Sequence, residues 1–124
     1  MKKIPQISDA EWEIMKIVWS NPKITANQVI EMLGDDVTWK PKTVKALINR
    51  LLNKGAIGYE KDGRSYLYYP LVSEKDCVKA ESESFLNKVF NGSFSLMMAN
   101  FLEKVELSPE DIEELKQMLD EGKK

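Results

Sequence analysis

Histidine is absent from this chain of 124 residues, and Cys77 is its single cysteine. The sequence therefore lacks the commonest general base and the usual ligands of a zinc ion. It also lacks a glycine-rich loop of the kind that binds nucleotide phosphates. We expect no catalytic residues, no metal site and no cofactor, and we do not expect an enzyme.

A lone cysteine cannot form an intramolecular disulfide, which fits a reducing compartment. We expect Cys77 to be inert rather than a redox or metal switch. Long hydrophobic runs are missing too, because no stretch approaches the ~20 apolar residues of a membrane-spanning helix. The first residues, MKKIPQIS, contain no apolar core of a secretory signal. These features predict a cytoplasmic protein without membrane insertion.

The net charge of −2 conceals a difference between the two halves of the chain. Residues 1–70 carry 11 Lys/Arg and 8 Asp/Glu, whereas residues 71–124 carry 7 and 12. A basic half followed by an acidic half indicates two separate tasks. The acidic total does not exclude a nucleic-acid partner, since only the contacting face must be positive.

Three amphipathic helices are predicted in the first half. The box SDAE at 8–11 begins the first helix, and Asn21-Pro22 ends it. The box TANQ at 25–28 begins the second, and Gly34 ends it. The third lies within WKPKTVKALINRLLNKG at 39–55, where proline suits the first helical position and apolar residues recur at helical spacing before the final glycine.

Two strand-like runs, AIGYEK and RSYLYY, flank Asp62-Gly63, which predicts a β-hairpin. Three helices followed by a hairpin is the order of a winged helix-turn-helix, with the hairpin as the wing. The predicted fold class is mainly α with a small β-hairpin. We assign residues 1–71 to a winged-helix DNA-binding domain and residues 72–124 to a helical dimerisation domain.

The second half is also predicted to be helical. The boxes SEKD at 73–76 and SPED at 108–111 begin helices, and Asn91-Gly92 should break or bend the chain between two apolar stripes. So little helix buries too little apolar surface to offset its ordering entropy. It must therefore pack on the first domain, on another protein or on a second copy of this chain.

We favour a second copy, because a two-fold pair would read both half-sites of a palindrome. The apolar stripes supply the residues that we expect in the dimer interface, which are Val78, Phe85, Leu86, Val89, Phe90, Met97, Phe101, Leu102, Ile112, Leu115 and Leu119.

The outward face of the third predicted helix contains no acid, and neither does any position from 39 to 55. A solvated helix usually mixes charges for pairing, so this composition favours a polyanion over water alone. In a helix-turn-helix, side chains near the start of the second helix usually reach base edges. We assign Lys42, Thr43, Lys45 and Ala46 to the major groove, and Arg50 to a phosphate.

Residues outside the third helix extend this predicted DNA-binding set. Asn27, at the start of the second helix, could meet a phosphate together with the free N–H groups of that helix. Lys61 and Arg64 straddle the wing turn, where phosphates or the minor groove would lie.

Aromatic side chains could in principle stack on bases, but packing is the simpler interpretation. Trp12 and Trp19 lie on the apolar side of a capped helix and are assigned to the core. Tyr66 and Tyr68 fall on one face of the hairpin, and we expect them to pack the wing against the helices.

Several separate segments resemble the BlaI/MecI penicillinase-repressor family. These segments are ISDAEWEIMKIVW, WKPKTVKALINRLLNKG, the tyrosine-rich strand with LYYP, FLNKVFNGS, and MMANFLEKVELSPEDIEELKQML. The resemblance implies a homodimeric repressor on palindromic operators that control β-lactamase or penicillin-binding-protein genes. It also implies that the residues assigned above to the major groove and to a phosphate occupy the recognition-helix positions.

The resemblance further implies how such a repressor is switched off. Induction would follow proteolytic cleavage of the bond between Asn100 and Phe101, triggered by a membrane sensor-protease that responds to β-lactams. The related copper-responsive repressors carry cysteine pairs near the C-terminus. This chain has none, so copper sensing is not expected.

Two positions depart from the family pattern. Serine often precedes the proline of the third helix, whereas this chain has Lys40, which cannot accept a hydrogen bond from the helix amides. The lost cap would cost about 1 kcal/mol unless phosphate binding compensates, so Lys40 joins the DNA-binding candidates. Threonine is common where this chain has Ala46, so its base preference there can differ.

Two alternative functions stand beside the leading hypothesis of a dimeric DNA-binding repressor. The first is a winged-helix module that binds a protein and no DNA, but such a module would not need an acid-free third helix. The second is a repressor of the same fold that answers a different signal.

Overall fold

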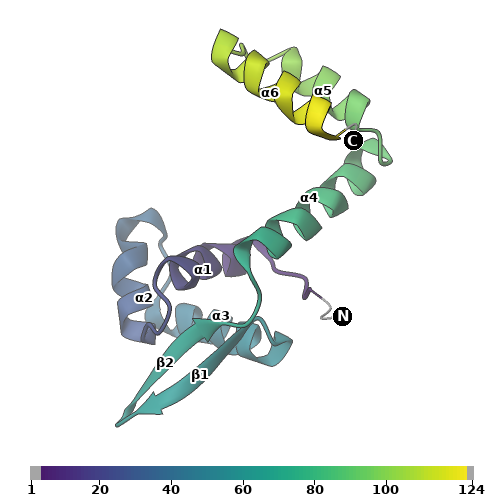
Figure 1. The fold of residues 1–124 in the computed structure, drawn as a ribbon. Helices are drawn as coiled ribbons and strands as arrows, with labels where there is room; N and C mark the ends of the chain where they lie inside the picture. Colours follow the sequence, from purple (N-terminus) through teal and green to yellow (C-terminus); the bar gives the residue numbers. More distant parts are fainter. Residues whose placement is uncertain (1–3, 123–124) are drawn as a thin grey trace. The chain divides into compact units, whose positions relative to one another are not determined.

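The computed structural model describes residues 4–122, which form six α-helices, one short 3-10 helix and two strands (Figure 1). The chain divides into two compact units between Glu81 and Ser82, and each unit is described by itself. The fold is mainly helical with a small antiparallel hairpin, so the predicted fold class is confirmed.

The first unit begins with three helices, α1 (Asp9–Ser20), α2 (Ala26–Leu33) and α3 (Pro41–Lys54), with a 3-10 turn at Gly34–Asp36 after α2. The capping boxes predicted for α1 and α2 are both present. The Ser8 hydroxyl accepts from the Glu11 amide at 3.2 Å, and the Thr25 hydroxyl accepts from the Gln28 amide at the same distance. Gly55 ends α3 in the left-handed conformation, as a glycine C-cap predicts.

The hairpin consists of β1 (Ile57–Asp62) paired antiparallel with β2 (Ser65–Pro70). Its turn is Gly63-Arg64, one residue later than the predicted Asp62-Gly63. Gly63 has a φ of 64°, whereas Arg64 has no positive φ, which is the pattern of a type II′ turn. Glycine decides this position because a type II′ turn requires a positive φ at its first central residue.

A further pair of hydrogen bonds ties the hairpin to the segment between α1 and α2. The amide of Ile24 donates to the Tyr68 carbonyl at 3.0 Å, and the Tyr68 amide donates to the Ile24 carbonyl at 2.8 Å. The base of the wing is therefore held by main-chain contacts. Figure 1 shows the other end of the hairpin projecting past the helices.

The core of the first unit lies where the apolar sides of α1, α2 and α3 meet. Its fully buried side chains include Ile14, Val29, Val44, Leu51 and Ile57. Trp12 and Trp19 pack against this core with their rings edge to face, 5.6 Å apart. The indole N–H of Trp19 also donates to the Val72 carbonyl at 2.9 Å. The predicted packing role of both tryptophans is confirmed.

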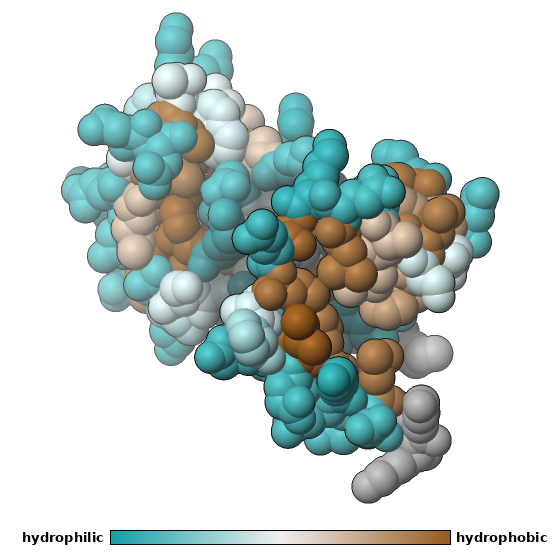
Figure 2. Space-filling view, turned by 90° about the horizontal axis from the view of Figure 1, so that it is seen from above, coloured by the Kyte–Doolittle hydropathy of each residue, from teal (hydrophilic) through white to brown (hydrophobic). Residues whose placement is uncertain are grey.

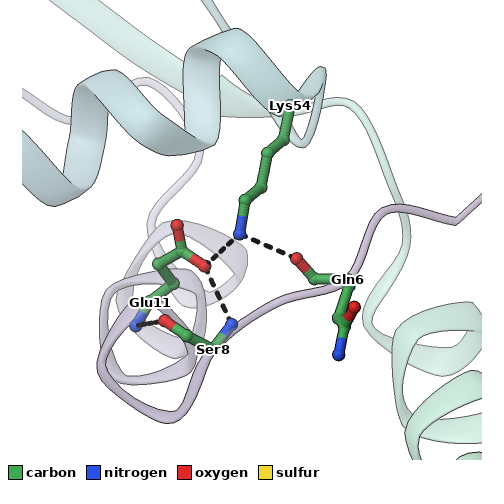
Figure 3. A network of polar contacts seen from close by, with 4 residues as sticks. All are labelled: Gln6, Ser8, Glu11 and Lys54. Carbon is green, nitrogen blue, oxygen red and sulfur yellow. Dashed lines mark hydrogen bonds and ion pairs between the residues drawn. The ribbon is translucent and has the colours of Figure 1, made fainter.

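One charged group is buried in this unit. Glu11 is 1% exposed, and its carboxylate accepts from Lys54 Nζ at 2.5 Å and from the Ser8 amide at 2.8 Å (Figure 3). Lys54 also donates to the Gln6 carbonyl at 2.8 Å. The network joins the start of α1 to the end of α3.

The Glu11 carboxyl has opposing influences on its pKa. Burial raises the pKa, but the Lys54 ammonium and the Ser8 donors outweigh burial and hold it below the usual value. The second carboxylate oxygen, Oε2, has no hydrogen-bond partner among the described residues. The charged form of Glu11 is therefore favoured in the folded chain.

The helix α4 (Glu74–Phe90) begins in the first unit, where Val72 and Cys77 are part of the buried core. The compact unit thus extends to residue 81 and includes the first turns of α4, which the sequence assigned to the second domain. Burial, and then the neighbouring Asp76 carboxylate, raise the pKa of the Cys77 thiol. A buried protonated thiol is a poor nucleophile, which supports an inert Cys77.

The second unit contains the end of α4 together with α5 (Phe94–Leu102) and α6 (Pro109–Gly122). The predicted break lies at Asn91 and Gly92, whose φ angles are 51° and 82°. The two helices that flank it are in contact through an edge-to-face pair, since the ring centres of Phe90 and Phe101 lie 6.4 Å apart. Between residues 4 and 122, no helix is long and apolar enough to cross a membrane.

Candidate nucleic-acid interface

The outward face of α3 is the first part of the candidate site. Its residues Lys42, Thr43, Lys45, Ala46 and Arg50 are all exposed, as predicted. The same helix buries Val44, Leu47, Ile48 and Leu51 on its opposite side, because residues three and four apart share one face. Within the described chain, no ion pair within 4.0 Å involves a cation of this outward face. Its charges are therefore free for a ligand.

A groove of about 360 Å³ lies between the start of α2, the middle of α3 and the tip of the wing. Three predicted residues meet in it, namely Asn27 from α2, Lys45 from α3 and Arg64 from the hairpin turn. These residues are far apart in the sequence, so the fold creates the cluster. Among the residues that the structure describes, no acidic side chain lines the groove.

The start of α2 adds a partial positive charge to this groove. Its first turn contains no acidic residue, and Thr25, Ala26 and Asn27 all line the groove. The Gln28 amide donates to the Thr25 hydroxyl, and the Thr25 amide donates to the Gln28 side chain. The amides of Ala26 and Asn27, at the first two positions of the helix, have no carbonyl within the helix to accept them. The positive end of a helix with free amides favours an anion.

Several predicted residues lie outside the groove. Lys42, Thr43, Ala46 and Arg50 are on the exposed face of α3 but do not line the groove. Lys40 precedes α3, is exposed and makes no side-chain capping bond, as predicted.

Lys61 lies on β1, opposite Tyr66 of β2. Its ammonium nitrogen is 5.9 Å from the centre of the Tyr66 ring.

The structure also places residues in the groove that the sequence did not assign to DNA binding. Asn49 lines it, and its position four residues after Lys45 on the same helix face could have revealed it. Ser65 and Tyr66 line it as well. Their position beside the groove depends on the hairpin register, and the predicted turn at Asp62-Gly63 gives a different register.

The expectation for the two hairpin tyrosines was half wrong. Tyr68 packs against the core as expected, and burial, followed by the nearby Tyr66 and Tyr59, raises its pKa. Tyr66 is 43% exposed instead and faces the groove. Tyr66 lies closer to the hairpin turn than Tyr68. The turn end of the hairpin extends past the helices, so the side chains there meet no core.

The chemistry of this surface is dominated by donors. The groove is lined by the cations of Lys45 and Arg64, by the side-chain amides of Asn27 and Asn49, and by hydroxyl groups. Such groups suit the phosphate oxygens of a nucleic-acid backbone, which are acceptors. The exposed side chains on the first turns of α3 extend the same surface toward base edges.

The second unit presents a different surface. Large apolar side chains are exposed there, including Val89 at 52%, Leu102 at 49% and Leu119 at 58%. Figure 2 shows apolar atoms open to view among hydrophilic ones.

The residues predicted for the dimer interface divide by their exposure. Val78, Phe85, Val89, Phe101, Leu102, Ile112 and Leu119 are exposed, and Leu86, Phe90, Met97 and Leu115 are half-buried. Asn100 and Phe101 of the predicted cleavage bond are both exposed in the last turn of α5.

Comparison with solved structures supports the winged-helix assignment. The solution structure of the DNA-binding domain of the repressor BlaI matches with a TM-score of 0.54 and 49% identity, covering 61% of this chain and 93% of that domain. The Bacillus licheniformis BlaI monomeric form in complex with the blaP half-operator matches with a TM-score of 0.53 and 49% identity, with the same coverage.

The full-length relatives are also close. The penicillinase repressor of Bacillus licheniformis is 48% identical over 123 residues, which are 99% of this chain and 96% of the relative. The methicillin resistance regulatory protein MecI of Staphylococcus aureus (strain N315) is 44% identical over 117 residues, which are 94% of this chain and 95% of the relative. The model of the penicillinase repressor family matches residues 7–121. The chain therefore belongs to the penicillinase repressor family, whose members are transcriptional regulators and not enzymes.

Proposed function

We propose that this protein is a homodimeric transcriptional repressor that binds palindromic operator DNA. The observation that carries the proposal is the exposed, acid-free face of α3 beside a groove lined by cations and amides. The relative captured with a half-operator supports it, because that protein is 49% identical over 61% of this chain. A protein-binding module would have no need for such a surface.

In this proposal α3 is the recognition helix. Lys42 and Lys45 donate to guanine acceptors or to phosphates, and the short side chains of Thr43 and Ala46 approach thymine methyl groups. Arg50 lies farther along the helix and meets a phosphate. The wing and the start of α2 position the helix through phosphate contacts from Arg64, Lys61 and Asn27, with Lys40 as a further cation.

The composition of the second unit supports the proposed dimerisation. Among the described residues 82–122, no side chain is fully buried, although large apolar residues recur on every helix. Helices without a core of their own do not offset the entropy of ordering the chain. A second copy would cover these side chains and would set two recognition helices on successive turns of a duplex.

We further propose that cleavage between Asn100 and Phe101 ends repression. The bond lies at the exposed end of α5, just before the connection to α6. Cutting there would separate α6 from α4 and α5 and remove part of the dimer interface. The genes controlled would be those of β-lactamase or penicillin-binding proteins, and a membrane sensor-protease would supply the cut.

DNA binding is tested by removing two cations from α3. The double variant Lys42→Ala/Lys45→Ala should bind a duplex from the upstream region of its own gene more weakly. The slope of log K against log[salt] should also fall in magnitude by about 2, because each neutralised phosphate contributes about 0.9. The matched control is Lys75→Ala/Lys79→Ala, two exposed lysines of α4. An unchanged slope in the first variant would contradict the proposal.

Cleavage is tested separately from binding. Asn100→Asp and Phe101→Ala should each slow cleavage in induced cells while leaving operator affinity unchanged. Asn87→Asp in α4 is the matched control, since Asn87 is also exposed in the second unit. Mass spectrometry of the chain from induced cells reads the outcome, and no break near residue 100 would remove this part of the proposal.

A further inference from the structure

Tyr66 has an unusual position on the wing. Its side chain is 43% exposed and lines the groove that also contains Asn27, Lys45 and Arg64. Tyr68, two residues later on the same strand face, is used in the core, whereas Tyr66 has no place in it. An aromatic ring left open to solvent at the rim of a cationic groove is a candidate ligand contact.

The Tyr66 ring has two neighbouring side chains on the adjacent strand. Tyr59, from the neighbouring strand, meets it edge to face with ring centres 5.1 Å apart and planes at 90°. Lys61, directly opposite in the strand register, lies with its ammonium nitrogen 5.9 Å from the ring centre. These contacts restrict the ring before any ligand binds, which lowers the ordering entropy lost on binding.

The chemistry of the groove determines what such a ring would touch. Lys45 and Arg64 would hold a phosphodiester backbone, and the groove contains no acid that would repel it. A phenolic O–H is a neutral donor to a phosphate oxygen, and the apolar ring suits the face of a deoxyribose. Tyrosine joins both properties in one rigid side chain.

We infer that Tyr66 is a DNA-backbone contact of the wing, with its phenolic O–H donating to a phosphate oxygen beside those held by Lys45 and Arg64. The inference rests on the proposed function and adds a residue to its DNA-binding surface. Because a phosphate contact carries no sequence information, Tyr66 would position the wing on any duplex. Tyr59, which does not line the groove, would support the ring and make no phosphate contact.

The test compares Tyr66→Phe with Tyr59→Phe in the full chain. Each variant loses one hydroxyl from an exposed wing tyrosine and keeps its ring. The probes are a duplex carrying the dyad upstream of the protein's own gene and a duplex of scrambled sequence. Tyr66→Phe should weaken binding about 3- to 10-fold on both duplexes, with an unchanged salt slope, since the lost donor is neutral. Tyr59→Phe should bind like the unmodified chain.

The outcomes separate this inference from the proposed function. If the unmodified chain binds the dyad duplex and Tyr66→Phe binds it equally well, Tyr66 is no contact, although the protein still binds DNA. Equal losses in both variants would point to a general disturbance of the wing and would also overturn the inference. If the unmodified chain binds neither duplex, the proposed function fails and the inference fails with it. Thermal melting of both variants confirms that each is folded.

Discussion

The two units of this chain contain similar amphipathic helices but use them differently. In the first unit the apolar sides of α1, α2 and α3 close on one another and bury Ile14, Leu51 and other side chains completely. In the second unit the apolar sides of α5 and α6 leave Leu102 and Leu119 about half exposed. The difference shows that amphipathic spacing predicts a buried face without saying what buries it.

The comparison also separates the two tasks of the molecule. The first unit completes its own core and can therefore expose cations on α3 and the wing for a ligand. The second unit retains exposed apolar surface, which a second copy would cover in the proposed dimer. The charge difference between the halves fits this division, because the basic residues of the candidate DNA surface all precede residue 71.

The largest expected effect contrasts a buried leucine with an exposed one. Leu51→Ala, in α3, should lower the free energy of unfolding by about 2–5 kcal/mol at any protein concentration, since it opens a cavity in a closed core. Leu119→Ala, in α6, should have an effect that depends on protein concentration and vanishes at dilutions where both chains are monomeric, because in the proposed dimer a second copy covers Leu119. Urea unfolding at several concentrations measures both. If the changes in unfolding free energy caused by Leu51→Ala and Leu119→Ala depended on concentration in the same way, the division between the units would be contradicted.

The next effect concerns the buried charge of the first unit, which has no counterpart among residues 82–122. Glu11→Gln should cost about 1–3 kcal/mol of unfolding free energy at pH 7, because Lys54 and the Ser8 amide lose a charged acceptor. The folded pKa of Glu11 is lowered, so its charge stabilises the fold above the ordinary value of 4.5. This stabilisation disappears as the pH falls through the lower folded pKa.

The difference between Glu11→Gln and the unmodified chain should therefore shrink in acid. Unfolding curves recorded between pH 7 and pH 3 measure it. The matched control is Glu13→Gln, which breaks an exposed pair with Lys16 at 3.0 Å and should change the unfolding free energy by less than about 0.5 kcal/mol. A constant difference across this pH range would show that the charge of Glu11 has no part in stability.

The smallest effect compares how helices begin in the two units. In the second unit Ser93 caps α5, whereas Lys40 precedes α3 without a capping bond. Lys40 has extended backbone angles that suit a cap, so Lys40→Ser should stabilise the fold by about 1 kcal/mol. Operator binding should weaken at the same time if Lys40 meets a phosphate. Lys40→Ala, which removes the charge and adds no cap, separates the two effects. Unaltered thermal melting in Lys40→Ser would show that the cap does not form.

Local chemistry in the sequence predicted much of the fold. The caps at Ser8 and Thr25, the end of α3 at Gly55 and the break at Asn91 depend on residues close in the chain. Such signals can be read without knowing the tertiary structure. The exposed face of α3 could be predicted for the same reason, since helical spacing fixes which side chains share a side.

Features that depend on distant residues could not be predicted. The pair between Glu11 and Lys54 joins positions 43 residues apart, and no local pattern relates them. The hairpin turn lies one residue later than predicted because glycine suits either central position of a two-residue turn. Gly63 is the second central residue of the predicted turn and the first of the observed one. That shift changes the cross-strand partner of Tyr66, which is Lys61 and not Tyr59. The exposure of Tyr66 further depends on how far the wing extends past the core, which no local pattern shows.

Sedimentation equilibrium of the full chain at micromolar concentration tests the central claim most directly. We predict a mass of about twice the 14.2 kDa of one chain, because in the proposed dimer a second copy covers the apolar surface of the second unit. Addition of a palindromic duplex should then give a complex of two chains per duplex. A mass of one chain, with unfolding that does not depend on concentration, would contradict the account.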